Sequence, residues 1–286
     1  MSRAALPWEA VVVGGGPAGL AAGLQLSRAG LRTVLLERGA LGGQARRLSV
    51  IENAPGWPGG VSGPRLMSAY VRQARAWGLK TVRGELAGLA PGVRAQRLTL
   101  TDGRRLSALS VVLATGARFK PLKAPGAERL WGRGVQHAAF DAAGAWRGRA
   151  VAVIGGGEAA VHQAAHLARS ARVVTLVARG PLKAHRLLLA RLAARPNVAV
   201  RRGRVLRVEG RGRVTGLVLS GGERLKASAV FVLIGARASA WARFASRPGV
   251  FVAGDARGGL ERQVAVAAGD GMAAAMRAMR WLRERP

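Results

Sequence analysis

One stretch near the start of the chain constrains the fold more than any other: residues 11–39, which read VVVGGGPAGLAAGLQLSRAGLRTVLLERG. An apolar strand pattern leads into G-x-G-x-x-G, formed by Gly14, Gly16 and Gly19, and a helical pattern and a second apolar strand follow. Glu37 ends that second strand. The glycines allow a tight turn and a close approach to a pyrophosphate, and the carboxylate suits a ribose diol. The stretch therefore predicts an adenine dinucleotide without a 2′-phosphate.

The same pattern returns over residues 152–180 and overlays the first stretch without a gap. Gly155 and Gly157 stand for the first two glycines, and Ala160 takes the third place, which this fingerprint tolerates. At the strand end, Ala178 replaces the acid. The chain therefore holds two nucleotide-binding units, and the second lacks the carboxylate that would repel a 2′-phosphate.

Basic residues follow the second strand end, which favours NADP over NAD in that unit. Arg38 occupies in the first unit the place that Arg179 has in the second, so this arginine alone does not discriminate between the two nucleotides. NADH remains an alternative, as does a vestigial site that binds nothing. The basic residues expected near a 2′-phosphate are Arg179, Lys183, His185 and Arg186.

The charge balance is unusual, because 46 basic and only 14 acidic residues give the 286-residue chain a net charge of +32. The basic residues are scattered, which fits either a dispersed solvated surface or attraction of an acidic partner. No nucleic-acid motif accompanies the charge, so an acidic protein partner is favoured over nucleic acid. The sequence contains no cysteine, which excludes disulfides and thiolate metal sites within it. His162 and His166 lack further ligands, and no metal site is expected.

The composition indicates a globular α/β protein, with 49% apolar residues and alternating strand and helix patterns. The first ten residues lack the long apolar core of a signal peptide. Residues 10–27 carry no charge, but their glycines and Pro17 suit a nucleotide turn rather than a membrane span. We therefore expect a cytoplasmic protein without a membrane-spanning helix.

Several segments together resemble the low-molecular-weight thioredoxin reductases over nearly the whole chain. They are GGGPAGLAA at 14–22, GGQ at 42–44, ENAPGWPGGVSGPRLM at 52–67, ATG at 114–116, GGGEAA at 155–160, GVFVAGD at 249–255 and RQVAVAAGDGMAAA at 262–275. The resemblance implies two Rossmann-like domains, the second inserted into the first, with small antiparallel β-hairpins. An FAD domain would comprise residues 1–117 and 245–286, and an NAD(P) domain residues 118–244. It also implies a homodimer.

The resemblance assigns cofactor roles to residues along the chain. It brings the last helix to the isoalloxazine, where a helix N-terminus would stabilise negative charge on reduced flavin. The residues implied for FAD are Gly14, Gly16, Pro17, Ala18, Gly19, Glu37, Arg38, Gly43, Gln44, Asn53, Thr115, Gly116, Gly254, Asp255, Arg262, Gln263 and Val264. Those implied for NADPH are Gly155, Gly157, Glu158, Ala159, Arg179 and Lys183.

The chain departs from the thioredoxin reductases where their C-x-x-C pair lies. His137 and Phe140 stand in the cysteine positions, and Asp141 matches the acid that follows the pair. Without a thiol the chain cannot form a mixed disulfide, so dithiol relay is excluded. This local form is similar to the ferredoxin/flavodoxin-NADP reductases built on the same fold. His137 and Asp141 are candidate proton donors near the flavin, although His137 also fits a structural role.

Two further departures concern the nucleotide and flavin sites. The H-R-R-x-x-x-R phosphate clamp of the thioredoxin reductases is reduced to residues 178–180 with Lys183, and the segment before Pro248 is shorter. We expect an FAD enzyme that moves electrons between NAD(P)H and ferredoxin or flavodoxin, a quinone, or oxygen. The alternatives are a flavoprotein reduced by a protein carrier or organic substrate, and a flavin-binding basic interaction protein without turnover.

Overall fold

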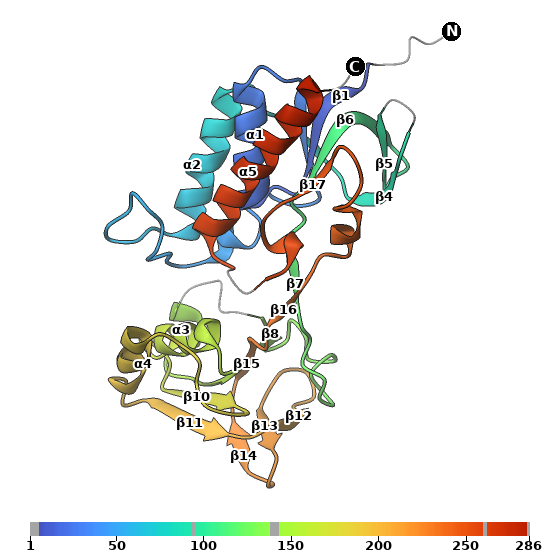
Figure 1. Cartoon of the computed structure of the whole chain (residues 1–286). Helices are drawn as coiled ribbons and strands as arrows, with labels where there is room; N and C mark the ends of the chain where they lie inside the picture. Colours follow the sequence, from blue (N-terminus) through green and yellow to red (C-terminus); the bar gives the residue numbers. More distant parts are fainter. Residues whose placement is uncertain (1–5, 93–94, 138–142, 260–261, 285–286) are drawn as a thin grey trace. The chain divides into compact units, whose positions relative to one another are not determined.

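The computed structural model describes residues 6–92, 95–137, 143–259 and 262–284. The chain forms two compact units (Figure 1): a discontinuous unit, residues 1–118 and 238–286, and an inserted unit, residues 119–237. Each unit is built on a parallel sheet with helices packed against it. The predicted α/β fold with two Rossmann-like units and small antiparallel hairpins is confirmed.

The discontinuous unit contains a sheet in the order β3-β2-β1-β6, whose strands are mutually parallel. Strand β17 pairs in parallel with the end of β6, and the hairpin β4-β5 pairs antiparallel with its beginning. The elements are β1 (Trp8–Val13), α1 (Pro17–Arg28), β2 (Thr33–Glu37), η1 (Ala45–Arg47), α2 (Gly63–Ala76), β3 (Lys80–Arg83), β4 (Leu86–Ala90), β5 (Gln96–Leu100), β6 (Arg105–Leu113), η3 (Ala240–Phe244), β17 (Val250–Val252), η4 (Gly254–Arg257) and α5 (Val264–Arg283).

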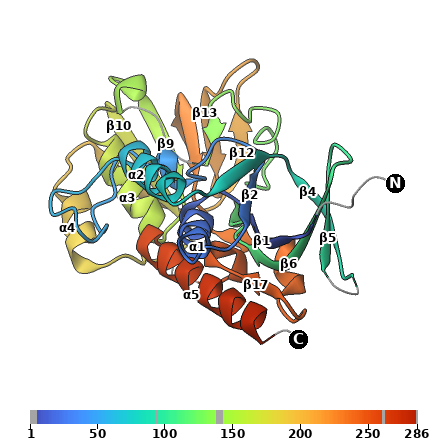
Figure 2. The same ribbon diagram turned by 90° about the horizontal axis from the view of Figure 1, so that it is seen from above.

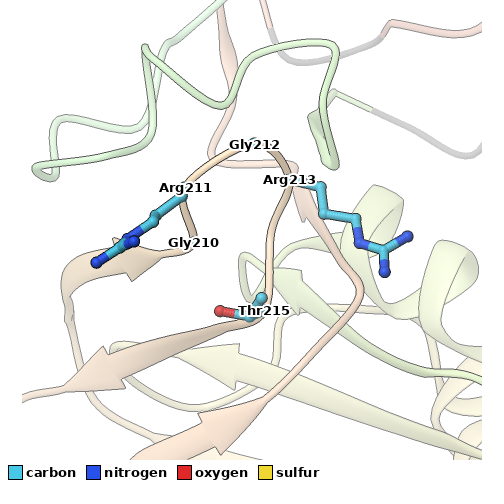
Figure 3. Close-up of a pocket in the computed structure, with 5 residues that line it drawn as sticks. All are labelled: Gly210, Arg211, Gly212, Arg213 and Thr215. Atoms are coloured by element: carbon cyan, nitrogen blue, oxygen red, sulfur yellow. The ribbon is translucent and has the colours of Figure 1, made fainter.

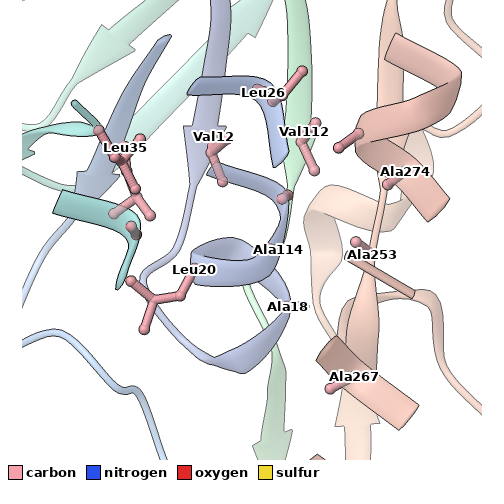
Figure 4. Packing of buried hydrophobic residues seen from close by; sticks show 14 of the residues in the cluster. Val12, Ala18, Leu20, Leu26, Leu35, Val112, Ala114, Ala253, Ala267 and Ala274 are labelled. Carbon is pink, nitrogen blue, oxygen red and sulfur yellow. The ribbon is translucent and has the colours of Figure 1, made fainter. Parts of the chain in front are cut away.

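Alternation along the central strands divides the core of this unit between two faces. Val12 and Val112 face the helices, whereas Val11 and Val111 face the hairpin and η3. Helices α1, α2 and α5 lie side by side on the first face (Figure 2). Figure 4 shows how small alanine side chains let α5 and the segment after β17 approach α1 and the end of β6.

A close helix contact in this core involves Gly271 of α5. An ideal Cβ at this glycine would lie 2.0 Å from the carbonyl oxygen of Ala18, in the first turn of α1. Because only glycine allows this approach, the packing fixes α5 directly against the N-terminal turn of α1.

The inserted unit repeats the architecture, with a parallel sheet in the order β11-β10-β9-β15-β8. An antiparallel sheet, β12-β13-β14, follows β11. The elements are β8 (Val135–Gln136), η2 (Ala143–Trp146), β9 (Ala150–Ile154), α3 (Glu158–Leu167), β10 (Val173–Ala178), α4 (Arg186–Ala193), β11 (Val198–Arg202), β12 (Val205–Glu209), β13 (Gly216–Leu219), β14 (Arg224–Lys226) and β15 (Ala229–Val232).

The two connections between the units pair with each other through β7 (Ala117–Phe119) and β16 (Ala236–Ala238). The second boundary between the two compact units lies at 237/238. Just after this boundary, Phe244 of η3 is 7% exposed and belongs to the core of the discontinuous unit. In the described ranges, no helix is both long enough and apolar enough to cross a membrane.

Candidate nucleotide-binding sites

The first glycine turn joins β1 to α1 in the conformation that a dinucleotide requires. Gly14 has a φ of +104°, and an ideal Cβ on Gly19 would lie 1.7 Å from the Gly14 carbonyl oxygen. Helix α1 begins with Pro17, and no side chain of the described residues caps its N-terminus at Gly16. The amides of this first turn are therefore available to phosphate oxygens, with the positive end of the helix dipole behind them.

Glu37 ends β2 beside this turn and is half-buried. Its Oε2 accepts a hydrogen bond from the Gly15 amide at 2.6 Å, and its Oε1 accepts one from the Gly39 amide at 2.8 Å. A carboxylate oxygen has two acceptor positions, so each oxygen can still receive a ribose hydroxyl. The sequence placed the acid at the strand end, and the structure adds that the glycine turn itself holds the carboxylate in position.

A hollow of about 700 Å³ opens next to Glu37, at the carboxyl ends of β2 and β3. In open α/β sheets, ligands bind at this edge. Two of its three arginines are paired with acids: Arg38 with Glu85 at 2.9 Å and Arg104 with Asp102 at 2.7 Å. The hollow is lined by Arg38, Val82, Arg83, Gly84, Glu85, Thr101, Asp102 and Arg104.

The loop after β2 folds back over the glycine turn. The Gly42 amide donates to the Gly15 carbonyl at 2.7 Å, and Gly43 approaches Gly16 so closely that an ideal Cβ would lie 2.9 Å from the Gly16 Cα. The Gln44 side chain then donates to the Ala117 carbonyl at 2.8 Å. The loop thus brings Gln44 to the carboxyl end of the sheet, beside the segment that follows β6.

Thr115 and Gly116 lie just after β6, separated from it by Ala114, and Gly116 has a φ of +67°. The Thr115 hydroxyl is buried and has no hydrogen-bond partner in the described part of the chain. It lies next to the glycine turn, since an ideal Cβ at Gly14 would be 3.3 Å from the Thr115 Cα. A buried hydroxyl normally has a partner, so a polar ligand bound along this edge would satisfy it. This observation fits an FAD that runs across the carboxyl ends of the strands.

Two predicted flavin residues from distant parts of the sequence meet in the structure. The Asn53 side-chain amide donates to Gln263 Oε1 at 3.0 Å. Gln263 is the N-cap residue of α5, followed by Val264 at the first helical position, and no side chain in the described ranges caps this N-terminus. Arg262 precedes it. The start of α5 therefore presents backbone amides and the positive end of its dipole next to Asn53.

Gly254 and Asp255 begin η4, separated by one residue from the end of β17. Gly254 has a φ of +64°, and its amide donates to Asp270 Oδ2 at 2.8 Å. Asp270 also pairs with Arg257 at 2.6 Å, which holds the turn in place from α5. The sequence did not single out Asp270 for this role. Burial raises the pKa of Asp255, and the charge of Arg262 opposes that shift.

The second glycine turn, in the inserted unit, has the same construction with different strand-end chemistry. Gly155 has a φ of +144°, and α3 begins after Gly157 without a side-chain cap from the described residues. The Lys183 amide donates to the Gly156 carbonyl at 2.7 Å, just as the Gly42 amide does to Gly15. At the strand end, Ala178 takes the place of Glu37. The turn therefore suits a pyrophosphate, and its strand end carries an alanine where the first unit carries a carboxylate.

Glu158 and Ala159 occupy the first turn of α3. Glu158 faces His185 across 4.0 Å, and both side chains are about half exposed. Arg179 is exposed at the start of the loop after β10. Lys183 is exposed in the same loop. The predicted NADPH residues are thus brought together around one turn.

His137 belongs to an aromatic cluster of the inserted unit. Its ring lies between Phe119, at 4.7 Å, and Trp131, at 4.5 Å, measured between ring centroids. Its Nδ1 lies 3.2 Å from the Val232 carbonyl oxygen, and burial lowers its pKa despite that hydrogen bond. The neutral imidazole is therefore favoured. Its predicted role as a proton donor stays a prediction, and Asp141 lies outside the described residues.

A second hollow lies at the turn between β12 and β13 and contains none of the predicted site residues (Figure 3). Its backbone is tied down by Arg129, which donates to the carbonyls of Gly210 and Arg211. The turn is therefore held by structural hydrogen bonds. Among the described residues no group of three acidic or histidine side chains could bind a metal ion.

Comparison with known proteins agrees with this geometry. The family model for pyridine nucleotide-disulphide oxidoreductases matches residues 8–246. Bifunctional thioredoxin reductase/thioredoxin of Mycobacterium leprae is 36% identical over 96% of this chain and 66% of its own length. NADPH-dependent thioredoxin reductase 3 of Arabidopsis thaliana is 31% identical over 95% of this chain and 58% of its own length. The chain thus spans less than two thirds of either relative.

One solved structure has the same fold as this chain over nearly the full length of both proteins. The crystal structure of Lactococcus lactis thioredoxin reductase superposes with a TM-score of 0.90 at 27% identity, over 97% of this chain and 100% of that one. The similarity therefore covers both units and the glycine turns of each.

Proposed function

Because the chain belongs to the pyridine nucleotide-disulphide oxidoreductase family, we propose that it moves electrons between NADPH and an acceptor other than a disulfide. Thioredoxin reductases of this family use FAD and NADPH. The observation that carries the proposal is the absence of cysteine from a chain that otherwise keeps both nucleotide sites. FAD, when bound, would accept a hydride from the nicotinamide and pass the electrons onward.

The discontinuous unit supplies the residues that would hold FAD. The first turn of α1 binds the pyrophosphate, Glu37 accepts the ribose hydroxyls, and the buried Thr115 hydroxyl gains a partner. Asn53 and Gln263 support each other at the start of α5, and Asp255 follows β17. These groups would bind and orient FAD, and the dipole of α5 would stabilise negative charge near the N-terminus of that helix.

The inserted unit supplies the NADPH site. Its glycine turn offers uncapped amides to the pyrophosphate, and the loss of the strand-end acid at Ala178 removes repulsion of a 2′-phosphate. We assign no step to His137, because its Nδ1 already contacts the Val232 carbonyl oxygen.

An acidic electron-carrier protein, such as a ferredoxin or flavodoxin, is the acceptor that the charge favours. A net charge of +32 attracts an acidic protein and accelerates its association, most strongly at low ionic strength. A quinone and oxygen are the small-molecule alternatives to a protein acceptor. We also propose that the protein forms a homodimer and is located in the cytoplasm.

The first test is anaerobic mixing of the purified flavoprotein with NADPH or NADH in a stopped-flow spectrometer. NADPH should bleach the visible flavin absorbance, about tenfold faster at limiting concentration than NADH, because a charged phosphate contact contributes roughly 1.5 kcal/mol. Free FAD mixed with NADPH is the control. Oxidised flavodoxin should restore the absorbance, whereas oxidised thioredoxin should not. If neither nucleotide bleaches the flavin, the proposed donor is wrong.

A further inference from the structure

In both units, corresponding residues lie at the carboxyl ends of two neighbouring strands, β2 and β3 in one unit and β10 and β11 in the other. We call this part of each sheet its corner. The sequence repeat covers β2 and β10 but does not extend to β3 and β11. In the discontinuous unit Glu37 pairs in register with Arg83, and the Gly84 amide donates to the Glu37 carbonyl at 3.0 Å. In the inserted unit Ala178 pairs with Arg202, and the Gly203 amide donates to the Ala178 carbonyl at 2.9 Å. The strand orders β3-β2-β1 and β11-β10-β9 are equivalent. Arg83 and Arg202 therefore occupy equivalent positions.

The charges of the two corners differ. The corner of the discontinuous unit carries the acids Glu37 and Glu85 and the arginines Arg38 and Arg83. Arg38 and Glu85 pair at 2.9 Å. In the inserted unit both acids are missing, since Ala178 replaces Glu37 and Arg204 replaces Glu85. The remaining residues form an arginine corner, which we define as Arg179, Arg202 and Arg204. All three are exposed, and none has an ion pair with a described residue.

The register also fixes the direction of Arg202. The Ala178 Cβ lies 3.2 Å from an ideal Cβ on Gly156, and the Glu37 Cβ lies 3.3 Å from one on Gly15, so both strand ends face their glycine turn. Paired residues on neighbouring strands project to the same face, about 4.8 Å apart. Arg202 is therefore on the face of the glycine turn. Arg201, on the opposite face, pairs with Glu223 at 3.0 Å.

We propose that the arginine corner binds the 2′-phosphate of NADPH, with Arg202 at the end of β11 and Arg204 just after it adding their charge to that of Arg179 in the loop after β10. This inference rests on the proposed NADPH site. A dianionic phosphate over Ala178 lies within reach of a neighbouring arginine side chain, whose planar fork of donors suits phosphate oxygens. The discontinuous unit, with Glu37 and Glu85 at its corner, would repel such a phosphate.

The test measures binding of 2′,5′-ADP and of 5′-AMP to the FAD-saturated chain by calorimetry, without turnover. The wild type should bind 2′,5′-ADP more tightly, and the Arg202→Ala/Arg204→Ala variant should lose at least about tenfold in that affinity with 5′-AMP unchanged. Arg201→Ala is the matched control and should keep the preference. Arg202→Lys should recover part of it, which separates lost charge from misfolding.

Each contrary result has a distinct meaning. If the double variant keeps the wild-type preference for 2′,5′-ADP, the arginine corner is not the phosphate site, and the proposed NADPH function stands. If the wild type binds 2′,5′-ADP and 5′-AMP equally tightly, the arginine corner is not a 2′-phosphate site, but the inserted unit still binds a nucleotide. If the wild type binds neither probe, the corner and the proposed NADPH site both fail.

Discussion

The Gly271→Ala variant is expected to be strongly destabilised and to lose bound FAD. The added Cβ would lie 2.0 Å from the Ala18 carbonyl oxygen and 2.8 Å from its carbonyl carbon. These are backbone atoms in the first turn of α1, so the clash cannot be relieved by a rotamer change. Either α5 moves outward or the first turn of α1 shifts. Overpacking of this kind costs about 3 kcal/mol, and the displaced turn is the one proposed to bind the pyrophosphate.

The matched control is Gly269→Ala, two residues earlier on the same helix. Gly269 is exposed, and an ideal Cβ there would meet no atom within 4 Å. Alanine in a helix interior is more favourable than glycine by roughly 0.5–1 kcal/mol, so this variant should be slightly stabilised. Urea unfolding and the FAD content of the purified proteins measure both effects. Equal stability of the two variants would contradict the contact between α5 and α1.

Much of the fold was predictable because its signals are local. The two βαβ units follow from G-x-G-x-x-G motifs and flanking apolar runs, and the structure places Gly14, Glu37 and Ala178 where that pattern indicates. The contact between Gly271 and Ala18 was not predictable, because nothing in the spacing along α5 distinguishes Gly271 from Gly269. Only the crossing of α1 decides which of these glycines is required.

Site features that depend on tertiary pairing were also missed. Asp270 holds the Gly254 amide from α5, and a carboxylate sixteen residues from a glycine has no recognisable spacing. The equivalence of Arg83 and Arg202 escaped the repeat comparison, because the connections that lead to β3 and β11 differ in length and content. The pairing of these strands with β2 and β10 restores the equivalence.

The packing of the segment that leads back into the discontinuous unit shows a different limitation. A short segment with a terminal proline, residues 235–248, has the composition of a linker. In the structure, Trp241 stacks with Phe244 at 5.7 Å, and Arg247 lies 4.4 Å from the Phe244 ring. Residues 240–244 therefore join the core of the discontinuous unit through aromatic contacts that composition alone underestimates.

The Glu37→Ala variant is expected to be purified with far less than stoichiometric FAD. The substitution removes the acceptor for the Gly15 and Gly39 amides and for the proposed ribose hydroxyls. The two hydrogen bonds from the proposed ribose hydroxyls to the carboxylate would together contribute about 3 kcal/mol to FAD binding. Their loss corresponds to roughly a hundredfold loss of FAD affinity. Titration of the deflavinated proteins with FAD, followed by flavin fluorescence, measures the loss.

Glu85→Ala is the control for Glu37→Ala, because it removes a carboxylate from the same corner without touching the glycine turn. It breaks the Arg38–Glu85 pair, whose side chains are 62% and 45% exposed. Exposed pairs of this kind contribute about 0–1 kcal/mol, so FAD affinity should change by less than about fivefold. A Glu37→Ala variant that binds FAD as tightly as Glu85→Ala would show that the turn amides alone hold the dinucleotide. Glu37 would then serve only to order the turn, and its replacement by Ala178 would carry no information about nucleotide choice.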